Sequence, residues 1–545
     1  MTPDIRSGLV RLRDRLGRQP NLPRYTFVAI AAALLPLMVL ASFDFGVTWD
    51  ERDRHRNGEF IWQFLRGNRS RSAFKETGGH LYPGLFDTIC VALESWVPAN
   101  RYVLRHAVNA VFGWVGIVYC GRLAGRLSGP WGGVLGLALL ALTPRYFADS
   151  MNNPKDLPFA AMTVVALYYI ATVSPRWPYV SLATAIKIAV ALALALNIRV
   201  GALLYLGYFG LLVGYYVLRE RQTDCRRLAN TAGRLLAVAV ATLFLGTVFW
   251  PWAGGAPLIR PFEALLGAAN YPWDGNVLFT GREYAADELP WYYAPWWFGI
   301  STPPVVLLGA GLSLATFASR EDALRRAALW IVVIFPVAAG IVMRSTLYDG
   351  VRHLQFVTPV LVLLAVGGWV GVLRLNRSRR LRLTAAGILA VGMASLIVFG
   401  VRFHPNQGVY FNMLVGGPRR AFTYYDMDYW GNCVLQAVEW SAEQARRHGA
   451  VVTISGNPAH LVQLNAGRFR DLSFTYASRN RHAVYVHLAR GPIATLRRLA
   501  REPALYQVRT PDGAVLCTVT AGPTYGDLEA RHGAARAAEE KLDPR

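Results

Sequence analysis

Long apolar blocks, separated by short runs of charged residues, fill the chain up to about residue 400. An apolar block of roughly 17 to 25 residues is long enough to cross the hydrocarbon core of a bilayer as a helix. The sequence therefore predicts an α-helical polytopic membrane protein with about 11 transmembrane helices. The predicted spans are 25–43, 103–121, 129–147, 157–173, 179–196, 200–218, 232–251, 298–318, 327–343, 353–373 and 383–402.

The distribution of basic residues indicates the orientation. One further segment, 81–97, is apolar but short, and it carries Asp87 and Glu94. If it crossed the membrane, every later loop would change sides and the most basic loops would face outward. Because Lys and Arg favour the cytoplasmic side in short loops, we interpret 81–97 as an interfacial helix that lies on the membrane.

This orientation divides the chain between two sides of the membrane. The basic N-terminus, 1–24, is cytoplasmic, and the transmembrane domain 25–402 sends its long loops 44–102 and 252–297 to the outer side. The polar clusters also fall on the outer side, whereas the inner loops are short, basic and otherwise plain. An active site assembled from several outer loops is the simplest inference.

Composition agrees with a membrane protein and restricts its partners. Hydrophobic residues make up 53% of the 545 positions and charged residues 17%, with a formal net charge of +23. Much of the Arg lies in short loops, where it orients the chain and meets anionic lipid. We therefore expect membrane lipids and no nucleic acid as partners. The abundance of Arg, Ala and Gly suggests a bacterium, which would hold the chain in its cytoplasmic (inner) membrane.

Hydropathy falls after the last span, and the pattern becomes that of a small α/β domain over 403–524. An amphipathic helix is predicted at Gly431–His448, and short runs typical of strands follow it. These runs are Val451–Ser455, Leu472–Tyr476, Ala483–Leu488, Leu505–Arg509 and Ala514–Val519. The domain should be periplasmic, where Cys433 and Cys517 could pair, and 525–545 should form a charged tail.

Asp50 and Glu51 stand directly after the first predicted span. Two adjacent carboxylates at a membrane face are costly unless they are hydrated, paired or used. They could act as a general base or as a cation ligand. Alternatively, the following Arg52 and Arg54 simply neutralise them in a solvated helix.

Two outer turns contain several charged and polar residues that could bind phosphate. The first, Thr143–Asp156, contains Arg145, Asp149, Lys155 and Asp156. An Arg or Lys in this turn could bind a phosphate group. A chain-breaking Asn-Pro pair followed by a helix-capping Asp would also explain it as a plain turn.

The second turn, Arg344–His353, contains Arg344, Tyr348, Arg352 and His353. Two Arg and a His at the ends of two spans suit a lipid phosphate at headgroup depth. The alternative is that these side chains snorkel toward water and have no ligand.

Aromatic residues and one histidine complete the candidates. Trp291 and Tyr292, in the second long outer loop, could stack on a sugar face, although aromatic belts at membrane interfaces are common. His80 and Tyr82 precede the interfacial helix, and a lone His is usually structural. The polar and aromatic segments 404–417 and 426–431, after the last span, could dock the C-terminal domain on the membrane part.

The order and sidedness of these features resemble the GT-C superfamily of membrane glycosyltransferases, in particular the family of protein O-mannosyltransferases and bacterial aminoarabinose transferases. The hallmark of that family is an Asp-Glu pair after the first span, in a long outer loop with interfacial helices. The resemblance covers residues 25–400. The matching segments are Asp50-Glu51, the loop to His80, helix 81–97, the turn Thr143–Asp156, and Leu289–Tyr293 followed by Thr302-Pro303.

This resemblance implies an inverting transfer of a sugar from a polyprenyl-phosphate donor to a glycan, lipid or protein acceptor at the outer face. It implies Asp50 as the catalytic carboxylate, with Glu51 as its partner. The family's Lys-Pro before the interfacial helix is Tyr82-Pro83 here, so the lysine that contacts phosphate is unassigned. Candidates for the donor phosphate are Lys155, Arg344, Arg352 and Arg145, and candidates for substrate contact are His80, Tyr82, Asp149, Asp156, Tyr348, His353, Trp291 and Tyr292.

Other functions remain open at the level of sequence. No CxxC pair or carboxylate cluster requires a metal, although a divalent cation could assist, as in the oligosaccharyltransferase branch. The middle domains of protein O-mannosyltransferases are absent, so a protein acceptor is not specifically implied. An O-antigen ligase or polymerase, which uses lipid pyrophosphate, is a second hypothesis. A transporter of lipid-linked sugars is a third, but the charges lie at span ends rather than within spans.

Overall fold

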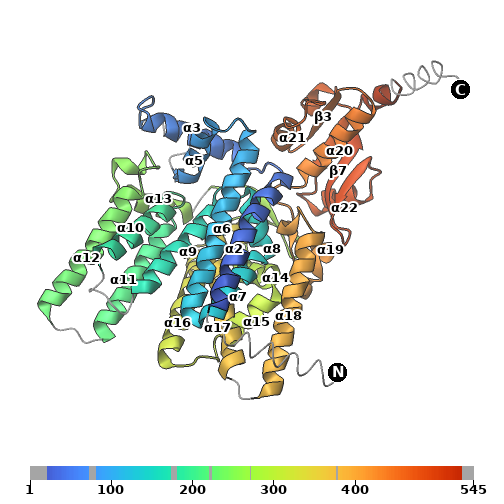
Figure 1. Ribbon diagram of the computed structural model, residues 1–545. Helices are drawn as coiled ribbons and strands as arrows, with labels where there is room; N and C mark the ends of the chain where they lie inside the picture. The colour runs from blue at the N-terminus through green and yellow to red at the C-terminus, as the bar shows by residue number, and fades with distance from the viewer. Residues whose placement is uncertain are drawn as a thin grey trace.

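The computed structural model describes residues 21–72, 81–173, 181–219, 224–269, 272–375 and 378–530. A bundle of long helices carries a smaller mixed domain at one end (Figure 1). The predictions for His80, for most of the basic N-terminus and for most of the charged tail lie outside the described residues.

Each of the eleven predicted spans coincides with helix. The helices are α2 (Leu22–Ala41), α6 (Arg101–Ser128), α7 (Pro130–Ala141), α9 (Asp156–Val173), α10 (Leu182–Leu196), α11 (Ala202–Arg219), α12 (Cys225–Leu245), α14 (Tyr293–Ser301) with α15 (Pro304–Leu312), α16 (Arg320–Val342), α17 (Thr358–Leu375) and α18 (Arg379–Arg402). Within the described ranges, seven helices are individually long and apolar enough to cross a membrane, and α7, α9 and α10 are shorter apolar helices. The chain is therefore a multi-pass membrane protein.

Two predicted spans are interrupted near prolines. In 129–147, helix α7 ends at Ala141 and the more polar α8 (Pro144–Asn152) begins. In 298–318, the chain is extended at Thr302 between α14 and α15. Proline disfavours the helical conformation of the residue before it and lacks an N–H of its own, so a helix usually stops there.

Small residues allow the central helices to approach closely. Gly121 on α6 faces Gly133 on α7, and a Cβ on Gly368 of α17 would collide with the carbonyl oxygen of Gly309 on α15. Between helices in lipid, burial of apolar surface gives little driving force, so close packing must supply it. Of the seven long helices, α17 is the most enclosed.

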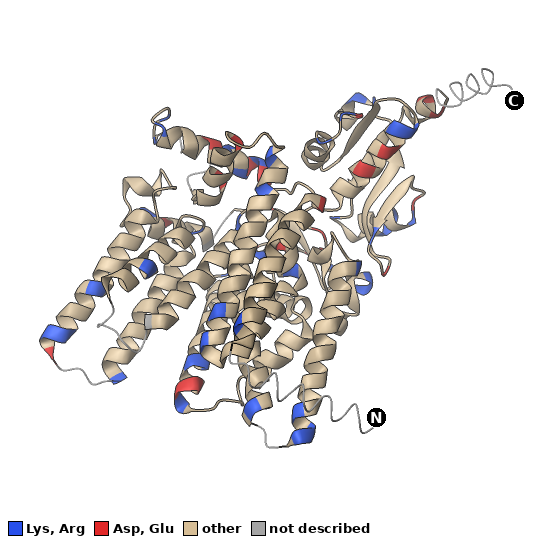
Figure 2. Ribbon diagram, viewed as in Figure 1, with Lys and Arg blue, Asp and Glu red and all other residues tan. Residues whose placement is uncertain are grey.

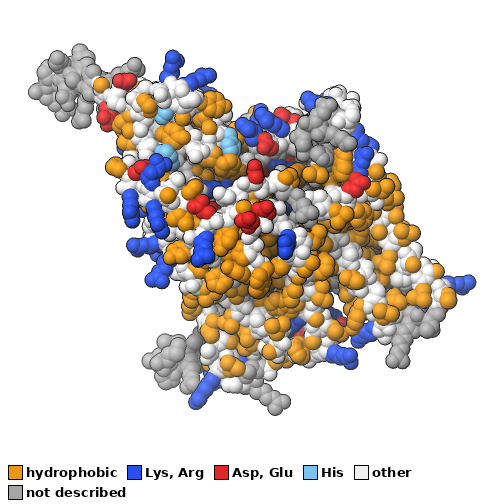
Figure 3. Space-filling model, turned by 180° about the vertical axis from the view of Figure 1, so that it is seen from behind, with side chains coloured by type: hydrophobic (Ala, Val, Ile, Leu, Met, Phe, Trp, Pro, Cys, Tyr) orange, Lys and Arg blue, Asp and Glu red, His pale blue; other side chains and the backbone are white. Residues whose placement is uncertain are grey.

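The outside of the bundle is apolar. Large hydrophobic side chains such as Leu40, Leu236 and Val401 are exposed, and Figure 3 shows hydrophobic side chains over the flank of the bundle. A continuous exposed apolar surface marks contact with a membrane or a partner. Lys and Arg mark the helix ends remote from the mixed domain (Figure 2), which is the end predicted to be cytoplasmic.

Short elements cover the end of the bundle nearest the mixed domain. They are η1 (Ser42–Asp44), α3 (Glu51–Leu65), α5 (Leu85–Glu94), α8, η4 (Ala253–Gly255), α13 (Arg260–Ala269), the hairpin of β1 (Asn276–Phe279) and β2 (Arg282–Ala285), and η5 (Arg352–Val357). The helix predicted at 81–97 is α5, which is too short to span and packs against α3. The hairpin has no counterpart in the sequence-based prediction.

The C-terminal part is the predicted α/β domain. It contains η6 (Gln407–Val409), η7 (Met413–Val415), α19 (Gly417–Ala421), α20 (Val434–Arg447), β3 (Val452–Asn457), α21 (Ala459–Ala466), β4 (Leu472–Phe474), η8 (Ala477–Arg479), β5 (Val484–Leu488), α22 (Ile493–Arg501), β6 (Tyr506–Arg509) and β7 (Val515–Ala521). The sheet order is β4-β3-β5-β7-β6; β3 runs parallel to β4 and β5, and β7 antiparallel to β5 and β6. The five predicted strands and α20 are confirmed, whereas the pattern does not predict α21 or α22.

A disulfide ties the helix of this domain to its sheet. Cys433, at the start of α20, is bonded to Cys517 on β7. α20 buries Val434 and Val438 in the same hydrophobic cluster as the strands of the sheet. Disulfides persist in oxidising compartments, which agrees with the periplasmic location predicted for this domain.

Two exposed positions at opposite ends of the molecule test the orientation. Cys225, at the start of α12, is exposed, whereas Cys90 and Cys120 are buried. With the C-terminal domain outside, an Arg479→Cys variant should react with a membrane-impermeant maleimide added to intact cells. Wild-type Cys225 should react only after lysis. The reverse pattern of labelling would invert the orientation.

Candidate active site

The loop between α2 and α3 is fastened by the C-terminal domain. The backbone N–H of Gly46 donates to Asn432 Oδ1 and that of Val47 to Asn465 Oδ1, each at 3.0 Å. Arg468 donates to the carbonyl oxygen of Phe45 at 3.2 Å. These bonds satisfy backbone groups that would otherwise be buried without partners, and they set the position at which α3 begins.

Asp50, the residue before α3, lies between two cations. Its Oδ2 is 3.1 Å from Lys155 Nζ and 3.3 Å from Arg352 Nη1. The Asp50 side chain is 27% exposed, so it remains accessible, while Lys155 and Arg352 are largely buried. Burial alone would raise the pKa of Asp50, but the charges of Lys155 and Arg352 outweigh it and hold the pKa well below its usual range.

Lys155 reaches Asp50 from the turn that joins α8 to α9. Asn153 Oδ1 accepts hydrogen bonds from the N–H groups of Lys155 and Asp156, which shapes the turn at the start of α9. The Lys155 ammonium lies 5.2 Å from the centre of the Tyr82 ring. Burial lowers the pKa of Lys155, against the opposing effect of Asp50.

Arg352 connects the site to the C-terminal domain. Besides Asp50, its guanidinium is 3.2 Å from Asp349 Oδ2. The other oxygen of Asp349 accepts from Arg490 at 2.6 Å, and Arg490 also donates to the carbonyl oxygen of Tyr429. Arg490 lies two residues after β5. The contacts Arg490–Asp349–Arg352–Asp50 therefore run from the C-terminal domain to the helix bundle.

Aromatic rings enclose Arg352. Its guanidinium lies 4.7 Å from the Tyr348 ring and 4.9 Å from the Trp430 ring. Tyr348 stacks on Trp273 at 4.1 Å and meets His353 edge-on at 4.7 Å. Rings at these distances fix the direction of the guanidinium and add cation–π attraction.

Asp156 pairs with a cation on the next loop. Its carboxylate contacts Arg199, which precedes α11, and Asp156 itself is buried. The ion pairs described so far join three carboxylates, Asp50, Asp156 and Asp349, to four cations. The cations are Lys155, Arg199, Arg352 and Arg490. This excess of positive charge leaves the site suited to an anion.

Glu51 does not share the accessible position of Asp50. It is buried, accepts from the N–H and hydroxyl of Thr48 at 2.8 and 3.0 Å, and lies 3.1 Å from His106 Nε2. These contacts pin the first turn of α3 against α6. The Glu51 carboxylate is therefore enclosed by protein groups, whereas that of Asp50 is partly exposed.

Arg145 and Asp149 form a separate group where α8 meets the C-terminal domain. Arg145 donates to the carbonyl oxygen of Tyr410 at 3.1 Å, and its guanidinium lies over Trp297 and Phe411. Asp149 Oδ1 accepts from the indole N–H of Trp430 at 3.1 Å. Both side chains thus contact the C-terminal domain, and Trp430 of the segment 426–431 makes one of these contacts.

The remaining candidates lie away from Asp50. Arg344, Trp291 and Tyr292 are exposed, and within the described part of the chain none of them pairs with Asp50, Lys155 or Arg352. Trp291 and Tyr292 have the exposure expected of an interfacial aromatic belt. His80 lies outside the described residues.

Asp349, Arg199 and Arg490 belong to the site but are absent from the candidates chosen by sequence. Asp349 lies inside the Arg344–His353 turn, and an acidic residue between two Arg in that turn could have been chosen from the sequence as their ion-pair partner. Arg490 has no local signal, because many Arg occur in its domain. Among the residues that the structure describes, no three His, Cys, Asp or Glu side chains gather to hold a metal ion.

Comparisons with known proteins find similarity only at the level of structure. The sequence matches no protein-family model and no curated protein. The chain is structurally similar to ArnT from Cupriavidus metallidurans bound to undecaprenyl phosphate, with 14% identity over 92% of this chain and 98% of that chain and a TM-score of 0.47. For the apo state of that protein, the identity is 15% over 92% of this chain and 97% of that chain, and the TM-score is 0.48.

A shorter region is similar to the S. cerevisiae protein O-mannosyltransferase Pmt1-Pmt2 complex bound to the sugar donor. The identity is 16% over 47% of this chain and 38% of that chain, with a TM-score of 0.29. The order of sequence motifs predicts both similarities. They concern the fold, and the activity has to be inferred from this chain's own site.

The buried carboxyl of Asp149 should make stability depend on pH. Burial, reinforced by the charge of Asp156, raises its pKa from 3.8 to about 7. Because the folded state holds this proton more tightly than the unfolded state, the group destabilises the fold increasingly as pH rises from about 4 to 7. Asp149→Asn keeps an acceptor for Trp430 and should be more stable than wild type at pH 8, by up to about 4 kcal/mol.

Thermal unfolding in detergent between pH 5 and pH 8 measures this difference. The advantage of Asp149→Asn should shrink as the pH falls to 5. The control is Asp53→Asn, because the Asp53 side chain is 75% exposed. A stability difference that is independent of pH would contradict the raised pKa.

Proposed function

We propose that this protein transfers a sugar from a polyprenyl-phosphate donor to an acceptor hydroxyl at the membrane face that carries the C-terminal domain. The observation that supports it is the accessible carboxylate of Asp50 held between Lys155 and Arg352. A glycosyl transfer of this kind needs a carboxylate for the acceptor and cations for the leaving phosphate, and both are present within one site. The sequence resemblance to GT-C glycosyltransferases supports the same reaction class.

In the proposed step, the acceptor oxygen forms a bond to the anomeric carbon of the sugar. The bond from that carbon to the phosphate oxygen breaks, and its electron pair stays on the lipid phosphate. The hydroxyl proton passes to Asp50, which acts as general base. Attack from the face opposite the phosphate inverts the anomeric configuration.

Lys155 and Arg352 stabilise the leaving phosphate as its charge grows. Arg352 offers a planar guanidinium suited to phosphate oxygens, and Lys155 supplies a compact charge. The buried stems of both side chains keep the cations in place without the donor. Tyr82 lies beside Lys155, and His353 packs against Tyr348, whose ring faces Arg352, so Tyr82 and His353 are candidates for contact with the sugar.

Donor binding should also activate Asp50. Without the donor, Asp50 is the counter-ion of Lys155 and Arg352, and its low pKa makes it a weak base. A phosphate that takes over these cations weakens their hold on Asp50, so the pKa of Asp50 rises toward its ordinary value. The carboxylate then becomes a stronger base only when a donor is present, which limits wasteful reaction with water.

Asp50→Asn should abolish transfer while the protein still folds. Loss of a general base lowers kcat by roughly 10²- to 10⁴-fold. Donor binding should persist or tighten, because the variant leaves Lys155 and Arg352 without their counter-ion. Mass spectrometry of products formed from labelled undecaprenyl-phosphate sugars measures turnover, and donor binding is measured separately.

The matched control is Asp53→Asn, one turn along α3 and exposed, which should retain activity. Full turnover in Asp50→Asn would contradict the assignment of Asp50. Transport of an intact lipid-linked sugar into proteoliposomes, with no transfer product, would instead support the transporter hypothesis.

Arg490 should act as a positioning residue from the C-terminal domain. Without it, Asp349 has Arg352 as its only cation among the contacts described above, and Arg352 should be drawn away from Asp50 and the donor phosphate. We expect Arg490→Gln to raise the donor KM roughly tenfold, with a smaller change in kcat, and Arg490→Lys to restore part of the loss. Steady-state kinetics on the full chain separates the two constants.

Arg497→Gln is the control, because Arg497 is an exposed Arg on α22 of the same domain. It should leave both constants unchanged. Equal kinetics for Arg490→Gln and wild type would show that Arg490 does not position Arg352.

A further inference from the structure

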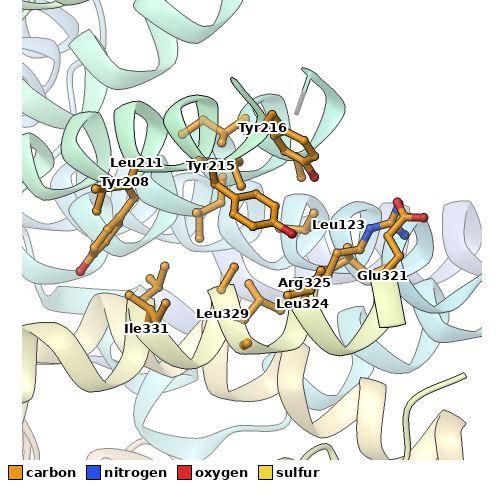
Figure 4. Close-up of a pocket in the computed structure, with 18 of the residues that line it drawn as sticks. Leu123, Tyr208, Leu211, Tyr215, Tyr216, Glu321, Leu324, Arg325, Leu329 and Ile331 are labelled. Carbon is orange, nitrogen blue, oxygen red and sulfur yellow. The ribbon is translucent and has the colours of Figure 1, made fainter. Parts of the chain in front are cut away.

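A cavity of about 500 Å³ opens between α6, α9, α11 and α16, in the half of the bundle remote from the C-terminal domain. Its walls are mainly leucine, isoleucine, valine and alanine side chains. Figure 4 shows Glu321 and Arg325 together at one end, Tyr208 at the other and Tyr215 between them. The volume lies within the range of small-molecule pockets, roughly 300 to 1,000 Å³.

One end of this cavity is strongly basic. Arg126, Arg219 and Arg325 line it from three different helices. Arg325 pairs with Glu321 at 2.6 Å, and because Arg126 and Arg219 also line this end, three cations face one carboxylate among the lining residues. Arg126 is held against Tyr168 by a hydrogen bond of 3.4 Å and lies 5.3 Å from the centre of its ring. An apolar cleft that ends in several guanidinium groups is complementary to an anionic amphiphile.

Aromatic rings close the other end. Tyr208 packs edge-on against Phe335 at 6.0 Å and against Tyr205 at 5.6 Å. Tyr205 in turn contacts Phe356 of η5 at 6.1 Å, directly below the polar site. This layer lies between the cavity and the cluster around Asp50, so an occupant of the cavity need not contact the proposed active site.

We propose that the cavity binds one anionic phospholipid of the leaflet on the side remote from the C-terminal domain. Its phosphate meets Arg126, Arg219 and Arg325, and an acyl chain fills the apolar part. The hydrocarbon of a polyprenyl donor is the competing occupant. It is disfavoured because its only charge lies at the opposite membrane face, and an uncharged chain gains nothing from three arginines. The proposal is independent of the proposed transferase activity.

The test measures lipid retention by the full chain in detergent, using native mass spectrometry with added dioleoyl-phosphatidylglycerol or dioleoyl-phosphatidylcholine. Wild type should retain one phosphatidylglycerol in preference to phosphatidylcholine. The triple variant Arg126→Gln/Arg219→Gln/Arg325→Gln should bind phosphatidylglycerol at least roughly tenfold more weakly. The matched control is Arg379→Gln/Arg380→Gln/Arg382→Gln, because these arginines are exposed on α18 at the same face.

Equal loss in both triple variants would overturn the proposal, since it would reflect surface charge alone. Unchanged binding in the first variant would do the same. A second variant, Ala171→Trp, fills the cavity and leaves the arginines in place, so it should also lose the lipid; retention of the lipid would place the binding elsewhere. Displacement of the bound phosphatidylglycerol by undecaprenyl phosphate, one for one, would assign the cavity to the polyprenyl chain instead.

Discussion

The burial of one guanidinium, that of Arg352, organises the half of this molecule that carries the C-terminal domain. A buried cation is costly unless it is paired with opposite charge, and Arg352 forms ion pairs with Asp50 and Asp349, which come from separate loops. Asp349 needs Arg490 in turn, so the C-terminal domain is drawn into the same network. The assembly of the site and the docking of the C-terminal domain therefore depend on the same ion pairs. The same network leaves an accessible carboxylate facing two fixed cations.

The C-terminal domain thereby acquires a physical role. Its side chains Asn432, Asn465 and Arg468 hold the backbone of the loop before α3, and Arg490 supports Arg352. Side-chain amides suit this task because each can satisfy a backbone N–H and a neighbouring group at once. A loop at a membrane surface would otherwise be free to move, and a carboxylate that must meet a reacting hydroxyl requires fixed geometry.

The sequence predicts the fold better than the site, for a physical reason. Apolar length and strand alternation are local signals, so the spans and the five strands are visible without tertiary information. Charge distribution indicates which face a residue occupies, but not whether its side chain turns inward. Arg344 and Arg352 belong to the same predicted turn, yet Arg344 is exposed and Arg352 is buried against Asp50. Arg490 contributes through a contact 141 positions away, which no local pattern records.

The hydrogen bonds that hold the loop before α3 also impose an order on biogenesis. Gly46 and Val47 are separated from their partners by 386 and 418 positions in the chain. At roughly 5 to 20 residues per second, a ribosome needs on the order of 20 to 80 seconds to make the intervening chain. During that interval the first span and its loop are already synthesised, but Asp50 lacks the support that aligns it. A nascent or truncated chain without the C-terminal domain therefore lacks the side chains that hold Gly46 and Val47, and its loop before α3 has to wait for the last part of the chain to be made.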